Sequence, residues 1–276
     1  MPKSLVWLAS YPKSGNTWLR AFLANYFYQA DRAIPLSKIH QVSFGDSGFE
    51  AYARRAPIDH RHLNPGQLLR LRTDWLTEIS HRGPVNFVKT HNAHTRLGPG
   101  WWIPAALTHS AIYILRDPRD MVLSYADHWG IPVERAAAQI ADKRNQIQAN
   151  AKSVTQFLGS WSTHVEGWAK AREFRTIVVR YEDMLTQPDK EFARILTHIG
   201  APVEAKGLAQ AVERSSFSTL ARDEASNGFS ERGPQQETFF RSGTSGGWRS
   251  TLPPDLAAQI WQDHRSVMRR YKYTEA

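Results

Sequence analysis

The sequence lacks cysteine altogether, which excludes disulfide bonds, thiolate metal sites and cysteine nucleophiles. It also lacks any run of about 18 apolar residues, the length at which a helix can span a bilayer. The apolar run near its start, Leu5–Ala9, is too short for the apolar region of a secretory signal. From these absences we expect a cytoplasmic protein without a membrane span.

What is present is a globular composition with a basic balance. Hydrophobic residues make up 41% and charged residues 22% of the 276 residues, which argues against extensive disorder. The net charge of +9 suits an anionic partner, either nucleic acid, an acidic membrane or a phosphorylated small molecule. Without repeats or an evident linker, residues 1–276 are interpreted as one domain.

Four short apolar runs, rich in β-branched and aromatic residues, predict buried strands. They are Leu5–Ala9, Val85–Val88, Ala111–Leu115 and Thr176–Val179. Helical patterns lie between them: apolar residues recur at four-residue spacing over 18–27, a second helix is expected to begin at Pro118 with Asp117 as its cap, and a third covers 188–199. This alternation predicts an α/β fold, a parallel sheet flanked by helices.

Each predicted strand runs directly into polar residues. The sequences that follow are YPKSGN, KTH, RDPRD and RYED, in chain order. Ligands of open α/β sheets bind beyond the carboxyl ends of the strands. We therefore expect these four segments to meet along one edge of the sheet.

The first polar segment, YPKSGNTW at 11–18, joins a strand to a helix. Gly15 permits a tight turn, the exposed N–H groups of a helix start can bind an anion, and Lys13 adds a positive charge. The segment does not follow the Walker pattern. On the residues alone, an ordinary turn with a surface lysine stays open, as does a core position for Trp18.

Lys89 and His91 lie two residues apart at a strand end and so point to the same side. Histidine is a natural general base near neutral pH, and lysine can neutralise charge on a transferring group. A hydrogen-bonded structural histidine is the alternative. His91 and His94 also form an HxxH pair, but no acidic residue or cysteine lies nearby, so we predict no metal site.

Two further segments carry candidate anion ligands. Arg116 ends a predicted strand, and Ser124 lies about two turns into the helix predicted at Pro118, so both could reach a phosphate near the start of that helix. In the alternative, Arg116 pairs with Asp117 or Asp120 and Ser124 faces solvent. Residues 222–248 are rich in glycine and show no clear helical period, which is typical of a lid or binding loop, with a disordered loop as the alternative. The sequence Arg241-Ser242-Gly243 lies within this stretch.

Taken together, these motifs resemble the cytosolic-type sulfotransferases that use 3′-phosphoadenosine 5′-phosphosulfate (PAPS). YPKSGNTW is similar to that family's YPKSGTTW, and KTH to its lysine-then-histidine segment. RDPRDMVLSY resembles its 3′-phosphate segment, RYEDM its (R/F)YEDM segment, and FFRSGTSGGWRSTL its RKGxxGDWK segment. The matches keep their order from Tyr11 to Leu252 and cover most of the chain.

The resemblance implies a P-loop-like fold and a role for each matching residue. The 5′-phosphosulfate would be bound by Lys13, Ser14, Gly15, Asn16 and Thr17. The adenine would lie between Trp18 and Phe217, near Tyr181. The 3′-phosphate would be bound by Arg116, Ser124 and the backbone of Arg241, Ser242 and Gly243. His91 would be the base, and Lys13 and Lys89 would stabilise the transferring group, without a metal. The product would be adenosine 3′,5′-bisphosphate (PAP).

The chain departs from the family pattern at several positions. Asn16 replaces the usual threonine, Gly247 replaces an aspartate, and Ser242 replaces a lysine, which removes one charged contact to the 3′-phosphate. The dimerisation segment of the animal enzymes is not evident in QIWQDHRSVMRRYKY. The oligomeric state is therefore left open.

Two other functions compete with this one. A kinase or other NTPase would share the fold, but the Walker lysine spacing is missing and no apolar strand ends in a magnesium-binding aspartate. A protein that binds nucleic acid or an anionic membrane would fit the basic charge near residues 269–272, but a solvated helix face fits it equally well. We expect neither nucleic acid nor a membrane as partner, but a small molecule with a hydroxyl group.

The acceptor pocket is expected from the variable stretches 30–82, 101–102, 129–157 and 222–247. They hold several aromatic residues, among them Phe44, Phe49, Trp75, Trp101 and Trp102. These hint at a flat, apolar or glycosylated acceptor, although they also suit a core. Phenols, alcohols, sugars, lipids and peptide natural products all stay open.

Overall fold

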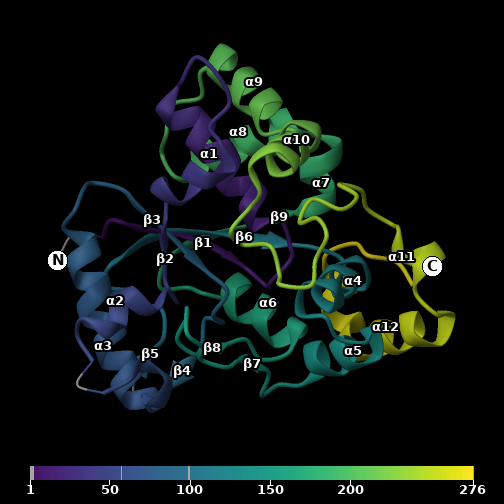
Figure 1. The fold of residues 1–276 in the computed structure, drawn as a ribbon, viewed down its shortest axis with the longest axis horizontal. Coiled ribbons are helices and arrows are strands. Elements are labelled where there is room, and N and C mark those ends of the chain that lie inside the picture. Colours follow the sequence, from purple (N-terminus) through teal and green to yellow (C-terminus); the bar gives the residue numbers. More distant parts are fainter. Residues whose placement is uncertain (1–2, 57, 99, 276) are drawn as a thin grey trace.

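A five-stranded parallel sheet forms the centre of the molecule (Figure 1). The computed structural model describes residues 3–56, 58–98 and 100–275. In spatial order the strands are β2 (Phe44–Gly45), β3 (Asn86–Thr90), β1 (Leu5–Ser10), β6 (Thr108–Leu115) and β9 (Arg175–Arg180). The predicted α/β class is confirmed.

Helices cover both faces of the sheet, which explains why the strands are apolar on both sides (Figure 1). In β1, Val6 and Leu8 face one core, while Leu5, Trp7 and Ala9 face the other. The first core is closed by α1 (Asn16–Tyr28), α7 (Tyr181–Thr186), α8 (Pro188–His198) and α9 (Ala205–Arg214). The second is closed by α3 (Pro65–Ser80), α4 (Pro118–Trp129), α5 (Val133–Ala141), α6 (Trp161–Ala169) and α12 (Pro254–Arg270).

All four predicted strands are confirmed, with ends shifted by one to three residues. Val85 lies outside β3 and is 44% exposed. The sequence pattern missed β2, which has only two residues and pairs with β3 at the edge of the sheet. A two-residue strand is too short to produce an apolar periodicity.

The predicted helix starts are also confirmed. Asp117 caps α4 by accepting a hydrogen bond from the backbone N–H of Arg119, and α8 begins at Pro188. The prediction that residues 222–248 are irregular throughout is wrong at its beginning, because α10 (Phe217–Asn227) continues to residue 227. Ser216 caps this helix, and its buried side is narrow, since Leu220 and Glu224 are its only residues classed as buried. A helix with so little apolar surface leaves a weak periodic signal.

The remaining elements are short. They are two 3₁₀ turns (Leu36–Gln41 and His60–His62), α2 (Phe49–Ala53), α11 (Trp248–Thr251), and the strand pairs β4 (Arg96–Leu97) with β5 (Gly100–Trp101) and β7 (Gln146–Ile147) with β8 (Gln156–Phe157). In the part of the chain that is described, no helix is both long and apolar enough to cross a membrane.

Candidate active site

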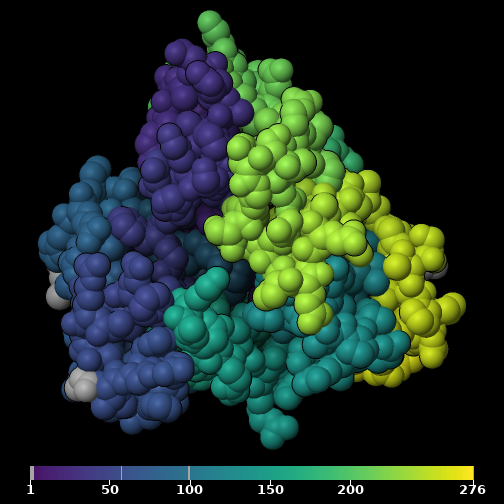
Figure 2. All heavy atoms as spheres, in the orientation of Figure 1, coloured from purple at the N-terminus to yellow at the C-terminus, as the bar shows by residue number. Residues whose placement is uncertain are grey.

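A cavity of about 430 Å³ opens at the carboxyl ends of the central strands. Figure 2 shows the hollow between the purple N-terminal part, the teal middle of the chain and the yellow-green segment that follows α10. The four polar segments meet here, as expected. The cavity is lined by these predicted residues: Lys13, Gly15, Asn16, Thr17, Trp18, Lys89, His91, Arg116, Ser124, Tyr181, Phe217, Arg241, Ser242 and Gly243.

Ser14 is the one predicted residue outside the lining. Its side chain is buried and its Oγ has no hydrogen-bond partner among the described residues. Its neighbours carry the turn: Lys13 has φ of 65° and Gly15 has φ of 106°. A Cβ on Gly15 would lie 2.7 Å from the ring of Tyr181, so only glycine fits. A lysine held in the left-handed region is strained, and such strain gathers at functional sites.

Asn16 ties the start of α1 to the sheet. Its Nδ2 donates to the carbonyl of Leu8 at 2.8 Å. The N–H groups at the helix start are thereby fixed at the carboxyl end of β1, beside the cavity. Asparagine at this position thus has a clear structural role.

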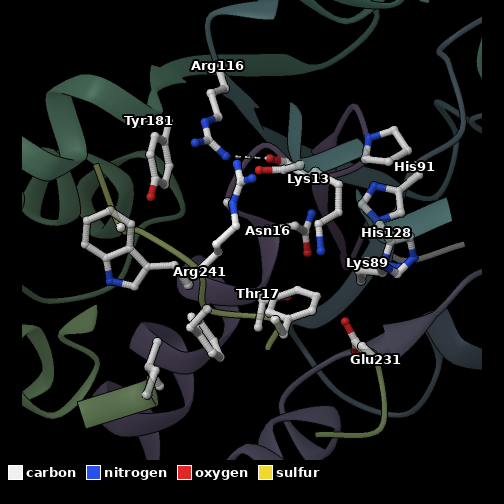
Figure 3. A pocket seen from close by; sticks show the side chains of 18 of the residues that line it. Lys13, Asn16, Thr17, Lys89, His91, Arg116, His128, Tyr181, Glu231 and Arg241 are labelled. Atoms are coloured by element: carbon white, nitrogen blue, oxygen red, sulfur yellow. Dashed lines mark hydrogen bonds between the residues drawn. The ribbon is translucent and has the colours of Figure 1, made fainter. Parts of the chain in front are cut away.

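Lys13 extends into the middle of the cavity (Figure 3). Its Nζ makes no hydrogen bond within the described structure and lies 3.5 Å from the centre of the Phe239 ring. Burial lowers the pKa of Lys13 to about 7, although Glu231 favours its charged form. A buried ammonium without a polar partner is a ready binding site for an anion.

His91 is held in one tautomer by the strand beside it. Its Nδ1 lies 2.9 Å from the carbonyl oxygen of Ser10, which can only accept, so Nδ1 carries the proton and Nε2 keeps a free lone pair. Burial, together with the neighbouring Lys89, lowers the pKa of His91 well below its usual value. Burial also lowers the pKa of Lys89. His91 is therefore a neutral imidazole that can accept a proton.

A buried ion pair supports the segment that carries Lys89 and His91. Asp46 follows β2 and lies 2.8 Å from the guanidinium of Arg72, and both side chains are fully buried. The same carboxylate accepts hydrogen bonds from Thr90 Oγ1 and Asn92 Nδ2. These two hydrogen bonds hold the residues on either side of His91 in place.

Arg116 is free to bind an anion. Its Nη1 donates to the carbonyl of Lys13 at 3.1 Å, and its guanidinium covers the ring of Tyr181. Its Nε has no hydrogen-bond partner in the part of the chain that is described. The alternative in which Arg116 pairs with an aspartate is wrong. Asp117 pairs instead with Arg119, and Asp120 accepts hydrogen bonds from the backbone of residues 246 and 248.

Several aromatic rings also line the cavity. Trp18 meets Tyr181 edge to face at 5.7 Å between ring centres. The backbone of Gly243 lies directly against Phe217, because a Cβ at residue 243 would be 2.3 Å from that ring.

Lys13 divides the cavity into two sides in Figure 3. Arg116, Tyr181 and Arg241 lie on one side, which we call the Arg116 side. Lys89, His91, His128 and Glu231 lie on the other, which we call the His91 side.

The irregular segment 228–247 contributes residues that the sequence did not single out. Glu231 enters the cavity and pairs with the buried Arg20 at 2.7 Å. Phe239 covers Lys13, and its backbone N–H is held by the carboxylate of Glu224. Burial opposes ionisation of Glu231, but Arg20 and Lys89 outweigh it and lower its pKa. No motif marks these positions, because loop conformation alone brings them to the site.

The aromatic residues proposed for an acceptor pocket do not line this cavity, and neither does any other described residue of stretch 30–82. Phe44, Phe49 and Trp75 border a second hollow, which shares Lys152 with the cavity, and Trp102 is in the core. Trp101 stacks on His94, so the two histidines of the HxxH pair face different cavities. Stretches 129–157 and 222–247 do reach the cavity, and they supply Trp129, Ile147, Lys152, Ser153, Gln156, Glu231, Phe239 and Phe240.

Comparison with known proteins agrees with this geometry. Residues 3–272 match the sulfotransferase domain. The chain belongs to the sulfotransferase family. This sulfotransferase is 26% identical to cytosolic sulfotransferase 12 of Arabidopsis thaliana over 96% of its own length and 76% of the relative's. It is 23% identical to sulfotransferase 1 family member D1 of Rattus norvegicus, over 95% and 82%.

Solved structures share the fold of this sulfotransferase. A retinol dehydratase superimposes with a TM-score of 0.64 at 18% identity, over 97% of this chain and 81% of the other. Mouse sulfotransferase SULT7A1 gives 0.61 at 19% identity, over 98% and 86%. Family membership excludes the kinase alternative as the primary activity.

Proposed function

We propose that this sulfotransferase transfers the sulfuryl group of PAPS to a hydroxyl of a small molecule. The observation that carries the proposal is a single cavity with two separate cationic places. Lys13 lies at its centre and Lys89 on the His91 side, whereas Arg116 and Arg241 lie on the Arg116 side. A nucleotide with a phosphosulfate at one end and a 3′-phosphate at the other matches this division.

The residues present fit such a nucleotide. Lys13 Nζ and Arg116 Nε are buried polar atoms that have no hydrogen-bond partner among the described residues, and an anion at each place would satisfy them. Asn16 and Thr17 at the start of α1 line the same cavity as Lys13, and the N–H groups of a helix start favour a negative charge. Trp18, Tyr181 and Phe217 offer ring faces for the adenine. Arg241 remains as a cation of this segment, while the usual lysine at the Ser242 position is absent.

The chemistry follows from the residues on the His91 side. The acceptor's hydroxyl oxygen attacks sulfur in line, and the bond from sulfur to the 5′-phosphate oxygen breaks. His91 Nε2 takes the hydroxyl proton as the new oxygen–sulfur bond forms. Lys13 and Lys89 offset the charge that develops on the transferred group and on the leaving PAP. Positioning and charge stabilisation provide most of the rate enhancement, as in phosphoryl transfer.

The related structures support the choice of donor and the size of the acceptor. The retinol dehydratase was solved with PAP together with androsterone or with retinol, and SULT7A1 was solved with PAP. Those ligands belong to those proteins. They support PAPS as the donor here and a small molecule as the acceptor.

Two measurements test the proposal. Calorimetry should detect PAP binding at one site per chain, and Lys13→Ala should weaken it. Radiolabelled PAPS should then transfer its label to at least one compound of a hydroxyl-bearing panel. Absence of PAP binding to the wild-type protein would overturn the proposal.

A further inference from the structure

One buried amide in the cavity has no hydrogen-bond partner. Gln156 is 7% exposed and lines the cavity, and its Oε1 makes no hydrogen bond in the described part of the chain. Leaving a buried polar atom unpaired costs free energy, which a ligand removes when it supplies the partner. An apolar side chain would fit an apolar acceptor without this cost. Gln156 therefore points to an acceptor that makes hydrogen bonds.

Gln156 is placed close to the proposed base. The backbone N–H of Phe157 donates to Asn92 Oδ1 at 2.8 Å, and the backbone N–H of Ala93 donates to the carbonyl of Phe157 at 2.8 Å. Strand β8 therefore lies directly against the residues that follow His91. Gln156 and His91 thus line the same cavity from two segments that are bonded to each other.

The cavity lining also combines flat apolar surfaces with polar groups. Trp129, Ile147 and Phe239 supply the apolar part. Lys152 and Ser153, which precede β8 in the chain, add hydrogen-bonding groups. Such a lining suits a ring that carries more than one hydroxyl better than an extended hydrocarbon.

We propose that Gln156 determines acceptor specificity by binding a second hydroxyl, adjacent on the ring to the one that receives the sulfuryl group. The acceptor class is then a vicinal diol on a flat ring. This inference rests on the proposed sulfuryl transfer. A hydroxyl both donates and accepts, and rotation of the glutamine amide about χ3 is soft, so either amide atom can meet it. Sites built to bind a hydroxyl discriminate strongly against analogues that lack it.

The test compares three acceptors on one ring: 2-naphthol, 2,3-naphthalenediol and 2,7-naphthalenediol. Wild-type kcat/KM should be at least about tenfold higher for the 2,3-diol than for the other two. Gln156→Met keeps the size of the side chain but removes its polar atoms, and should reduce this preference to less than about threefold. Gln146→Met is the matched control, since Gln146 is exposed on the paired strand β7 outside the cavity, and should keep the preference.

The outcomes separate the two proposals. A wild-type enzyme that shows no preference for the 2,3-diol, or a Gln156→Met enzyme that keeps it, overturns the role of Gln156. Turnover of none of the three compounds, while PAP binds, overturns the diol class but not the donor site. Absence of PAP binding overturns the proposed function itself. PAP affinity of Gln156→Met within about twofold of wild type shows that the variant is folded.

Discussion

At the scale of single residues, burial sets the charge of the groups around the cavity. His91 is kept neutral and Lys13 is brought to a pKa of about 7 by the same cause, removal from water. The consequences are opposite. A neutral imidazole is ready to act as a base, whereas a lysine with a lowered pKa holds its proton firmly only when an anion is beside it.

His91→Ala should lower kcat by at least about 10²-fold, because the acceptor hydroxyl loses its base. PAP affinity should stay within about twofold, since the predicted donor contacts do not involve this ring. Rapid-quench kinetics with labelled PAPS and calorimetry with PAP measure the two quantities. The exposed His62 gives a matched control in His62→Ala. Full activity in His91→Ala would remove this residue from the mechanism.

The lowered pKa of His91 also fixes the sign of a pH effect. The neutral, active form is present above that pKa and is lost only as the pH falls through it. The wild-type rate should therefore show no decline attributable to His91 between pH 8 and about 6.5, the ordinary pKa of histidine. A rate that falls tenfold per pH unit below pH 7, and does so with PAPS saturating, would contradict a depressed pKa.

Binding of PAP should take up a proton at pH 8. Free Lys13 is mostly neutral above its pKa of about 7, and a bound phosphosulfate or phosphate favours the charged form. Phosphate groups themselves titrate near pH 6, so uptake at pH 8 comes from the protein. Calorimetry in two buffers of different ionisation enthalpy measures it, and Lys13→Met should reduce it. Equal heats in both buffers would contradict the pKa of Lys13.

At the scale of elements, the segment 228–247 is held at several points although it has no regular structure. Glu231 pairs with Arg20 on α1, and Glu224 on α10 holds the backbone of residues 239 and 240. Asp120 on α4 holds the backbone of residues 246 and 248. Carboxylates on two helices, and one in the segment that pairs with an arginine on a third helix, thus replace the hydrogen-bond ladder that a strand would provide.

Asp120→Ala should weaken PAP binding by about tenfold without direct contact to the ligand. Its carboxylate accepts charge-assisted hydrogen bonds from the backbone that follows Arg241 to Gly243, and each such bond contributes about 1.5–3 kcal/mol. Calorimetry with PAP gives the change, and Asp263→Ala, on the exposed side of α12, is the control. An unchanged affinity would mean that residues 241–243 hold their conformation unaided.

The sequence predicted the central elements well and the covering segment poorly, for a physical reason. Continuous apolarity predicts strands such as Leu5–Ala9, and the capping chemistry of Asp117-Pro118 predicts the start of a helix. Both signals are local in the sequence. Gln156, Glu231 and Phe239 reach the cavity through contacts between distant parts of the chain, which leave no local pattern. The aromatic residues of stretch 30–82 do not line the cavity. The sequence could not show this, because a core and a ligand pocket use the same side chains.

At the scale of the whole molecule, one buried ion pair connects the edge of the sheet that carries Lys89 and His91 to helix α3. Arg72 on α3 bonds Asp46 and the carbonyl of Trp102, and its guanidinium packs against the rings of Trp7 and Trp102. The pair therefore joins a helix, the end of the edge strand β2 and a core loop.

Arg72→Met should lower the free energy of unfolding by about 3–5 kcal/mol, because it leaves Asp46 as an uncompensated buried charge. Urea denaturation followed by tryptophan fluorescence measures the change. The double variant Arg72→Met/Asp46→Leu should be more stable than the single one, since the orphan charge is gone. A single variant within about 1 kcal/mol of wild type would show that the pair is not needed for the fold.

Gly243 lies against Phe217, and both border the cavity whose floor is made by Lys13 to Trp18. The proposed nucleotide would thus be gripped by residues from the first tenth and the last quarter of the chain. During synthesis the grip is complete only after the chain has passed residue 243, so the nucleotide recognises only chains that contain both parts. At a hundred times its dissociation constant it would add about 2.7 kcal/mol to their stability. In a cell, the supply of the nucleotide would thereby help to set how much folded enzyme survives degradation.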